Sequence, residues 1–283
     1  MNSIELIGVS KDFGNVKALQ DINLTFEEGK IYGLLGRNGA GKTTMLKIIY
    51  EMLFPSTGTV RVDGREIGGD DTALGKMFFI GEKNYFPEQF TVEKAFYWMK
   101  QFRTEFDPAY AKRLADAFGL NIKKKIKSLS TGYASIIKNI LALASNAPFI
   151  LLDEPVLGLD ANHRDMFYKF MIEKYSESPF TAIISTHLIE EVANVVEHVV
   201  IVKDGRVIRD EPRETLLESG YSVSGRAEDV HAFINGREVL GIDALGGFET
   251  AYLFGECSKN ELPEGLEISK MNLQRLFIQL TNS

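Results

Sequence analysis

The residues best suited to chemistry lie in a glycine-rich stretch, GRNGAGKTT, at positions 36–44. It matches the pattern G-x-x-x-x-G-K-[ST], in which glycines let the backbone wrap a phosphate group with its N–H groups pointing inward. Lys42 is expected to bridge the β- and γ-phosphates of a nucleoside triphosphate, and the Thr43 hydroxyl to ligate Mg²⁺. The alternative is a glycine-rich turn without a ligand, which so complete a match disfavours. The predicted contact residues are Gly36, Arg37, Asn38, Gly39, Ala40, Gly41, Lys42, Thr43 and Thr44.

A magnesium ion needs a carboxylate ligand, and the run FILLDEP at 149–155 can supply one. Asp153 ends a wholly apolar predicted strand, which places it at the sheet edge where ligands of parallel sheets bind. Adjacent Glu154 is expected to orient a water molecule for attack on the γ-phosphate. A strand that ends in Asp-Glu is usually structural by itself. Together with the phosphate loop, it predicts binding and hydrolysis of a nucleoside triphosphate.

A second polar patch, LSTGY at 129–133, precedes the apolar stretch ASIIKNILALA. Hydroxyl groups and a glycine at the start of a helix can hold an anion, although a plain helix cap is the more common meaning of such a patch alone. If Ser130 is the N-cap residue, Thr131 falls at the first helical position, where φ is negative and its branched side chain is not strained.

The elements that must position these residues follow from the hydrophobic pattern. Apolar, β-branched runs at 31–36, 149–153 and 181–186 are each followed by a loop and a helix-like segment, which predicts a parallel sheet covered by helices. The opening third alternates β-like runs with turns, whereas the sequence between about Pro87 and Asn146 is typical of helices. The predicted fold class is α/β: a P-loop NTPase core with a mostly parallel sheet and flanking helices, an N-terminal antiparallel β subdomain, a helical insert and a small C-terminal α+β extension.

Bulk composition narrows the class of protein. The 283 residues are 45% hydrophobic and 25% charged, with a mean hydropathy of −0.07, which is typical of a soluble globular chain. A net charge of −7 argues against nucleic acid as the main partner. The single cysteine, Cys257, excludes an internal disulfide and suits a reducing compartment. We see no signal peptide, no covalent membrane anchor and no apolar run near the roughly 20 residues of a membrane span, so any membrane link is expected to come through a partner.

With LSTGY, FILLDEP, the LGLD that follows it and STHLIEE, the motif set resembles the ATP-binding subunit of ABC transporters. The resemblance covers about residues 4–210, and the motifs come in the family's order. In that family the signature at the place of LSTGY, usually Leu-Ser-Gly-Gly-Gln, contacts ATP on the opposite subunit. The resemblance therefore implies two identical or related chains packed head to tail, with each ATP between one chain's phosphate loop and the other's Ser130, Thr131 and Gly132. It also implies an ABC-type ATP-binding domain at 1–212, with a helical subdomain at about 87–146, and leaves 213–283 as an accessory α+β domain.

The same resemblance assigns roles to single residues. His187, in STHLIEE, stands at the family's switch histidine, which contacts the γ-phosphate, and Asp160, in LGLD, lies in the loop that crosses to the other subunit. Phe13 matches the aromatic residue that stacks on adenine. Glu82, after MFFI, takes the place of a glutamine that senses Mg²⁺ and would ligate the ion as an anion. The remaining histidines are expected to be surface residues: His163, His198 and His231.

The signature departs from the family pattern at two positions. Thr131 replaces the first glycine and Tyr133 replaces the glutamine. We expect the Thr131 methyl group to crowd the incoming phosphate, which predicts a slow site or one that works best opposite a different subunit.

The resemblance also implies a separate membrane-spanning permease subunit, with this chain cytoplasmic and peripheral on the inner face of the cell membrane. Phe96, Met99, Phe102 and Phe106 recur at near-helical spacing, which indicates either core packing or a groove for a short helix of that subunit. The closing MNLQRLFIQLTNS resembles the end of drug- and antibiotic-export ATPases, which favours export. The alternative is a soluble single-cassette ATPase that acts on a non-membrane assembly partner.

Overall fold

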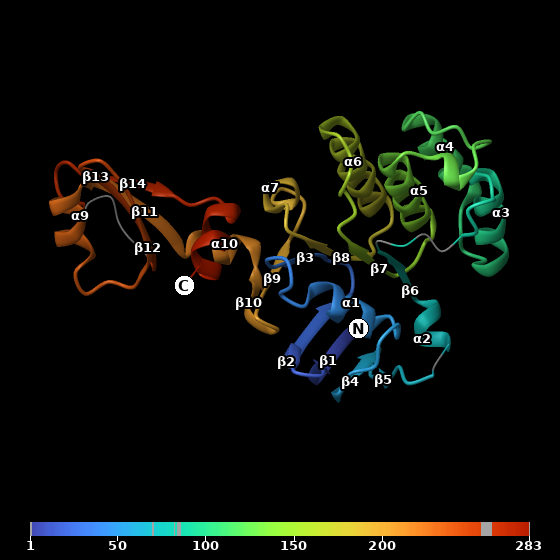
Figure 1. The fold of residues 1–283 in the computed structure, drawn as a ribbon, viewed down its shortest axis with the longest axis horizontal. Helices are drawn as coiled ribbons and strands as arrows, with labels where there is room; N and C mark the ends of the chain where they lie inside the picture. The colour runs from blue at the N-terminus through green and yellow to red at the C-terminus, as the bar shows by residue number, and fades with distance from the viewer. Residues whose placement is uncertain (1, 70, 82, 84–85, 256–261, 283) are drawn as a thin grey trace.

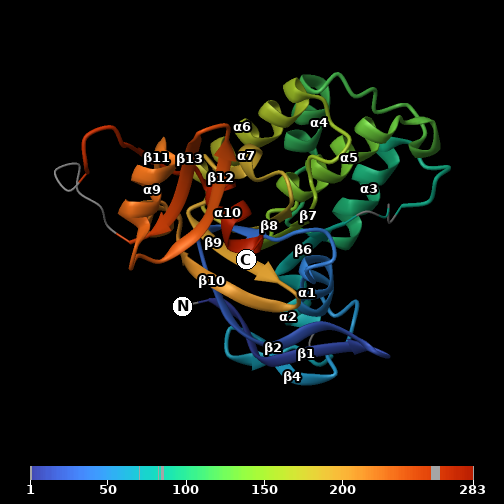
Figure 2. The ribbon, with the colours of Figure 1, turned by 60° about the vertical axis from the view of Figure 1, so that its left-hand side comes forward.

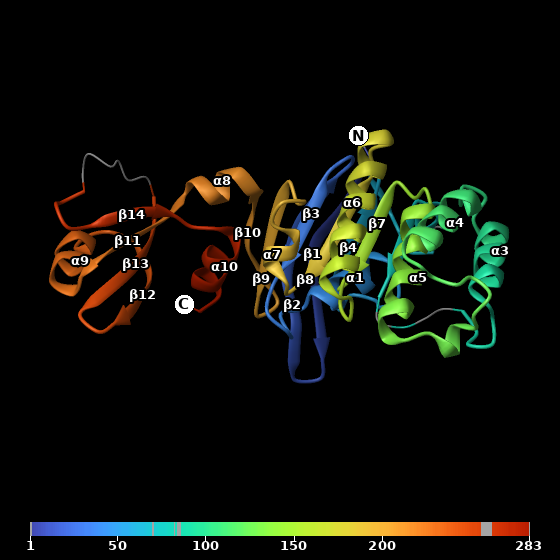
Figure 3. The same cartoon turned by 90° about the horizontal axis from the view of Figure 1, so that it is seen from above.

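The structure is a computed structural model that describes residues 2–69, 71–81, 83, 86–255 and 262–282. It contains three sheets with helices around them, and Figures 1 and 3 show the C-terminal sheet and a group of helices at opposite ends of an elongated molecule. The predicted α/β fold class is confirmed.

The first sheet is antiparallel, with strand order β2-β1-β4-β5. Its apolar side chains alternate along each strand, so one face packs into the core and the other faces solvent. Asp63 and Gly64 both have positive φ and make the tight turn that their Asp-Gly sequence predicts. The strands are β1 (Ser3–Phe13), β2 (Val16–Glu27), β4 (Thr57–Val62) and β5 (Arg65–Glu66).

The central sheet has the order β10-β9-β3-β8-β7-β6, with every neighbouring pair parallel except β10 and β9. All residues of β3 are buried, because helices or the first sheet cover both faces. The parallel register brings the C-terminal ends of β3, β7 and β8 to one edge, where the candidate site lies. The strands are β3 (Ile31–Leu35), β6 (Met77–Ile80), β7 (Phe149–Asp153), β8 (Thr181–Thr186), β9 (His198–Lys203) and β10 (Arg206–Pro212).

Helices flank this sheet, and three of them form a helical arm beyond β6 and β7 (Figure 1). Each arm helix begins where its sequence provides a cap: Thr91 accepts from the backbone N–H of Lys94, and Asp107 accepts from the N–H groups of Ala109 and Tyr110. The arm consists of α3 (Val92–Phe102), α4 (Pro108–Ala117), a short 3₁₀ helix (Ile126–Ser128) and α5 (Thr131–Ala144). The other helices here are α1 (Lys42–Ile49), α2 (Asp71–Gly75), α6 (Ala161–Glu177) and α7 (Ile189–Val192).

The C-terminal unit, which starts at Arg213, has an antiparallel sheet with the order β12-β13-β11-β14. Helix α9 covers one face of this sheet and shares a small core with it. Helix α10 instead packs back against α7 (Figure 2). Its Leu276 and Leu280 belong to the main core together with Ile189 and Val192. The division of the chain near residue 212 stays a prediction. The elements are α8 (Arg213–Glu218), β11 (Gly220–Arg226), α9 (Ala227–Ile234), β12 (Val239–Leu245), β13 (Phe248–Phe254), β14 (Glu267–Lys270) and α10 (Leu273–Asn282).

Within the described ranges, none of the helices combines the length and the apolar character that crossing a membrane requires.

Candidate active site

The phosphate loop joins the end of β3 to the start of α1, and two of its glycines are required by their surroundings. A Cβ at Gly36 would lie 2.7 Å from the Val202 carbonyl oxygen. Gly41 is the N-cap of α1 with a φ of 110°, and a Cβ there would lie 2.5 Å from the Ala18 carbonyl oxygen. Both approaches are closer than a side chain permits, so the loop conformation depends on glycine at these positions.

Lys42 is buried beneath the phosphate loop. Its Nζ donates to the carbonyl oxygens of Gly36, at 2.6 Å, and Arg37, at 3.2 Å. Burial lowers the pKa of Lys42, whereas the nearby carboxylates of Glu154 and Asp153 raise it. The backbone carbonyl oxygens hold the ammonium group beneath the loop, where its positive charge is suited to bind phosphate oxygens.

Thr43 and Asp153 bring two oxygen ligands together beside the loop. The Thr43 hydroxyl donates to Asp153 Oδ1 at 3.0 Å. Burial raises the pKa of Asp153, and the hydrogen bond from Thr43 lowers it. Mg²⁺ is commonly held by one or two protein oxygens together with water and substrate phosphates, so this pair fits the ion. In the described part of the chain, no cluster of three or more acidic, histidine or cysteine side chains offers a site for a metal without phosphate.

Glu154 and His187, predicted from separate motifs, are hydrogen-bonded to each other. His187 Nδ1 lies 2.8 Å from Glu154 Oε1, and because an ionised carboxylate only accepts, this nitrogen carries a proton. The Thr186 hydroxyl donates to Glu154 Oε2 at 3.1 Å. Glu154 has a φ of 50°, a left-handed conformation that costs a non-glycine residue about 1–3 kcal/mol. Sequence reasoning missed Thr186, although it stands directly before the motif histidine.

A cavity of about 560 Å³ lies over the phosphate loop. Its floor is Asn38 to Thr44, and Glu154 closes one side. The other walls come from the β1–β2 hairpin and the turn between β9 and β10, which sequence reasoning did not predict: Val16, Lys17, Ala18, Gln20, Asp204 and Gly205. Phe13 pairs with Val16 across the hairpin and is about half exposed, so its ring lies next to this wall and not in it. Signature residues do not line this cavity in the part of the chain that the structure describes.

The signature begins helix α5. Ser130 is the N-cap residue, and its hydroxyl accepts from the Tyr133 backbone N–H at 3.3 Å. Thr131 is therefore the first helical residue, as its position predicts, and it does not have a positive φ. Its methyl carbon Cγ2 lies 3.3 Å from the place that a Cβ of Gly158 would occupy. That the methyl group crowds a phosphate stays a prediction.

Asp160 is the N-cap residue of α6 and accepts from the backbone N–H of His163 at 2.9 Å. The ring of His163 lies 2.9 Å from the same carboxylate. The expectation that His163 is simply a surface residue is wrong, because its side chain is only 24% exposed and contacts Phe118 and Tyr133. His198, which lies against Tyr32, is also largely buried, whereas His231 is exposed.

Two further residues bear on the phosphate site: one predicted ligand, Glu82, and one unexpected contact from the C-terminal helix. Glu82, the predicted Mg²⁺ ligand after β6, lies outside the described residues. Arg37 in the phosphate loop donates to Asn282 Oδ1 at 3.3 Å, so the end of α10 reaches the loop. Nothing in the motifs predicted that contact.

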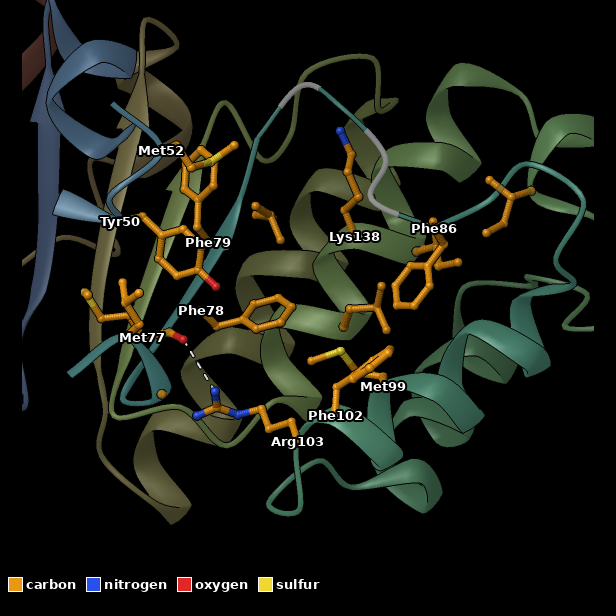
Figure 4. A pocket seen from close by; sticks show the side chains of 16 residues that line it. Tyr50, Met52, Met77, Phe78, Phe79, Phe86, Met99, Phe102, Arg103 and Lys138 are labelled. Atoms are coloured by element: carbon orange, nitrogen blue, oxygen red, sulfur yellow. Dashed lines mark hydrogen bonds between the residues drawn. The ribbon is translucent and has the colours of Figure 1, made fainter. Parts of the chain in front are cut away.

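A second cavity, of about 480 Å³, is apolar and lies between β6 and the helical arm (Figure 4). Met99 and Phe102 of α3 line it on one side and Phe78 on the other. Arg103 crosses its lower edge to the Met77 carbonyl oxygen at 3.4 Å. Of the four residues with near-helical spacing, Phe96 and Phe106 are core, Met99 is buried at the cavity wall, and Phe102 is 79% exposed.

Comparisons with known proteins place the chain in a family. The family model described as "ABC transporter" matches residues 19–157. The ABC transporter ATP-binding protein YtrB of Bacillus subtilis is 30% identical over 251 residues, which cover 88% of this chain and 86% of YtrB. The ABC transporter ATP-binding protein NatA of the same organism is 32% identical over 235 residues, covering 80% of this chain and 93% of NatA. The chain belongs to the ATP-binding proteins of ABC transporters, whose cassettes hydrolyse ATP to power transport.

Among solved structures, a bacterial ABC transporter cassette determined as a dimer matches with a TM-score of 0.67 and 26% identity, covering 74% of this chain and 98% of that one. Relatives at 28% identity are named for different cargoes. One is a bacitracin transport protein of Enterococcus faecalis, and another is a ribose import protein of Halalkalibacterium halodurans, matching 73% and 86% of this chain. The direction of transport therefore does not follow from the relatives.

Proposed function

We propose that this ATPase binds ATP with Mg²⁺ at the phosphate loop, and that its site becomes complete only when a second ATP-binding subunit packs against it head to tail. One observation carries the proposal. The cavity over the phosphate loop holds Glu154 but no described signature residue, so Ser130 is left to serve another molecule's ATP. The second subunit is either an identical copy or a related chain.

Each half of the proposed site has a defined role. On the phosphate-loop side, Lys42 and the loop N–H groups bind the phosphates, Asp153 and Thr43 hold Mg²⁺, and Phe13 stacks on adenine. Bound Mg²⁺ would neutralise charge on the phosphates. On the signature side, the Ser130 hydroxyl already accepts from Tyr133 and keeps its own hydrogen free to donate to a γ-phosphate.

Glu154 is the proposed base for the attacking water. His187 and Thr186 each hold one of its carboxylate oxygens, which fixes the direction in which the carboxylate points. Because Nδ1 of His187 is engaged with Glu154, Nε2 is the ring atom left to face the γ-phosphate. Phosphate oxygens accept hydrogen bonds, so this contact needs a proton on Nε2 as well as on Nδ1. Asp160 would contact the second subunit, because it lies in the loop that crosses to it.

Hydrolysis then opens the dimer. Hydrogen bonds to charged groups contribute about 1.5–3 kcal/mol each. The loss of one or two such bonds at each of two sites approaches the roughly 5.5 kcal/mol that inverts a two-state population. Cleavage of the γ-phosphate would therefore weaken the dimer by a free energy of the size needed to separate the subunits.

We also propose a separate membrane-spanning permease subunit as partner, docked by a short helix in the apolar cavity of Figure 4. The cavity matches such a helix in chemistry, since it has an apolar lining with an exposed aromatic side chain, Phe102, at its rim. Its two cations, Arg103 and Lys138, donate to backbone carbonyl oxygens at its edges. This chain would then be cytoplasmic and peripheral to the membrane.

Export is the proposed direction, because the closing segment resembles the end of drug- and antibiotic-export ATPases. Residues 213–283 are the proposed accessory domain. The alternative function is a soluble single-cassette ATPase with a non-membrane assembly partner, which co-purification with a soluble scaffold would support.

The test is the oligomeric state of Glu154→Gln, measured by light scattering with and without Mg-ATP. We expect a monomer without nucleotide and a dimer with it, because the variant binds ATP but does not hydrolyse it. Adding Lys42→Ala to the same variant should abolish the dimer. A monomer at every ATP concentration would contradict self-pairing and favour an obligate unlike subunit. ATPase activity from a strictly monomeric wild-type protein would overturn the proposal.

A further inference from the structure

The first turn of α5 packs directly on the loop at 157–160, which leads into α6. The Ser135 hydroxyl donates to the Leu157 carbonyl oxygen at 3.0 Å. A Cβ at Gly132 would lie 3.1 Å from the Gly158 carbonyl oxygen, and a Cβ at Gly158 would lie 3.3 Å from Thr131 Cγ2. The signature and this crossing loop are therefore in contact within one chain, before any second subunit is present.

His163 holds the Asp160 side chain at the end of the crossing loop, and Arg164 Nε donates to the adjacent Leu159 carbonyl oxygen at 2.9 Å. Both oxygens of the Asp160 carboxylate are engaged by His163, one by its backbone N–H and one by Nδ1, each at 2.9 Å. The backbone N–H of His163 is the main cause that lowers the pKa of Asp160. The Asp160 side chain is nevertheless 65% exposed, so it remains accessible to another molecule while His163 sets its direction.

The ring of His163 lies beside two aromatic side chains. Its centroid lies 5.9 Å from that of Phe118 and 6.2 Å from that of Tyr133. Phe118 packs in turn on Phe170, with centroids 5.6 Å apart. The Tyr133 hydroxyl reaches the end of α4, 3.7 Å from the place of a Cβ at Gly119. The ring therefore has two aromatic neighbours, as well as the Asp160 carboxylate, that limit its rotation.

We propose that Tyr133 and His163 are positioning residues: Tyr133 holds the His163 ring, and His163 holds Asp160, so that the signature and the crossing loop meet the second subunit as one rigid surface. The departure of Tyr133 from the family's glutamine is thus matched by a histidine three residues after Asp160. This inference rests on the proposed dimer. It assigns neither residue a contact with ATP, so nucleotide binding by the isolated chain does not depend on them.

Four variants in the Glu154→Gln background test the arrangement. His163→Leu keeps much of the volume but removes the donor, whereas the side-chain amide of His163→Asn can replace Nδ1. Tyr133→Leu removes the ring contact, and Tyr133→Phe keeps it. We expect the ATP concentration for half-maximal dimerisation to rise about tenfold in His163→Leu and to stay within about threefold of the parent in Tyr133→Phe. His163→Asn should fall between these two, because it restores the donor to Asp160 but not the ring that Tyr133 contacts. Binding of a fluorescent ATP analogue to the monomer should change less than about twofold.

The double variant Tyr133→Leu/His163→Leu separates positioning from general packing. If Tyr133 acts through His163, the double variant dimerises no worse than His163→Leu alone. If the increases in ATP concentration caused by the two single substitutions multiply in the double variant, the inference is wrong. It is also wrong if the His163→Leu protein dimerises like its parent. Should His163→Leu fail to fold in a melting experiment, the contrast between Tyr133→Leu and Tyr133→Phe decides: equal dimerisation of these two contradicts the role of the ring.

A matched control is His231→Leu, because His231 is exposed and pairs with Glu249 in the C-terminal unit. It should dimerise like the parent. If the Glu154→Gln parent itself stays monomeric with Mg-ATP, the proposed function fails in its self-pairing form. The inference then has to be measured against the unlike subunit, by the same variants and the same ATP titration.

Discussion

At the residue scale, the site combines groups whose positions are set locally with groups that are set by distant parts of the chain. Ser130 belongs to the first kind, since its place before an apolar helix is enough to make it an N-cap. Glu154 belongs to the second, because its direction depends on Thr186 and His187, more than thirty residues further along. Substitutions in the first kind are expected to act on one contact, and those in the second on several.

Thr131 offers the sharpest test among single residues. We expect Thr131→Gly to raise the ATPase rate by about two- to fivefold, because loss of the methyl group relieves crowding at the incoming phosphate. Thr131→Ser is the matched control, since it removes only the methyl group and avoids the cost of about 1 kcal/mol that glycine adds to a helix. Steady-state ATPase assays measure both. An unchanged or lower rate in both variants would contradict crowding and show that the contact with Gly158 matters more.

At the element scale, α10 is the feature that ties the C-terminal unit to the site. It packs on α7, the short helix directly after the His187 loop, and its end reaches Arg37 in the phosphate loop. Its buried leucines belong to the main core and not to the small core beneath α9. The C-terminal unit is therefore continuous with the ATPase core through this helix.

Truncation of one buried leucine of α10 should lower the stability of the main core if the C-terminal unit is continuous with it. Leu276 is fully buried, so we expect Leu276→Ala to lower the free energy of unfolding by about 2–5 kcal/mol. Leu245→Ala is the control, because Leu245 is 86% exposed at the β12–β13 turn and should change stability by less than about 0.5 kcal/mol. Denaturant unfolding measures both variants. Equal stability of the two would show that α10 is not part of the cooperative core.

The elements also show which structure the sequence could predict. The strands β3, β7 and β8 were predictable because each is a short apolar run buried on both faces. Strand β10 was missed, since RVIRDEP is mostly charged; it forms a half-exposed edge, where burial leaves little trace in sequence. The phosphate loop was recognisable because its groups are contiguous. The contacts of His163 and the packing of α10 on α7 could not be recognised in the sequence, because they depend on packing between segments far apart in the chain.

At the scale of the whole molecule, the surfaces for the proposed partners are separate but share helix α5. Its first turn carries the signature, which would serve the second ATP-binding subunit, and its later residues Ile137 and Leu141 line the apolar cavity, which would serve the permease. Helix α3 lines the cavity and carries no signature residue, so a substitution on its exposed side should damage permease docking and leave the dimer surface working.

Phe102→Glu tests this separation. A charge at the rim of the apolar cavity should reduce co-purification with the co-expressed permease subunit about tenfold or more, because an aromatic anchor is replaced by a solvated carboxylate. Phe248→Glu is the control, since Phe248 is 63% exposed on the C-terminal unit. ATP-dependent dimerisation of Glu154→Gln should be the same with either substitution. Equal recovery of the permease with both variants would contradict docking at this cavity.

The left-handed backbone of Glu154 has an evolutionary consequence. Asparagine and glycine adopt that conformation more easily than glutamate, so replacing Glu154, the proposed base, with either residue should relieve local strain. A duplicated gene that lost hydrolysis in this way would still encode a well-folded protein able to pair with an active copy. One or two base changes could thus convert a homodimer with two hydrolytic sites into a heterodimer in which only one site hydrolyses ATP.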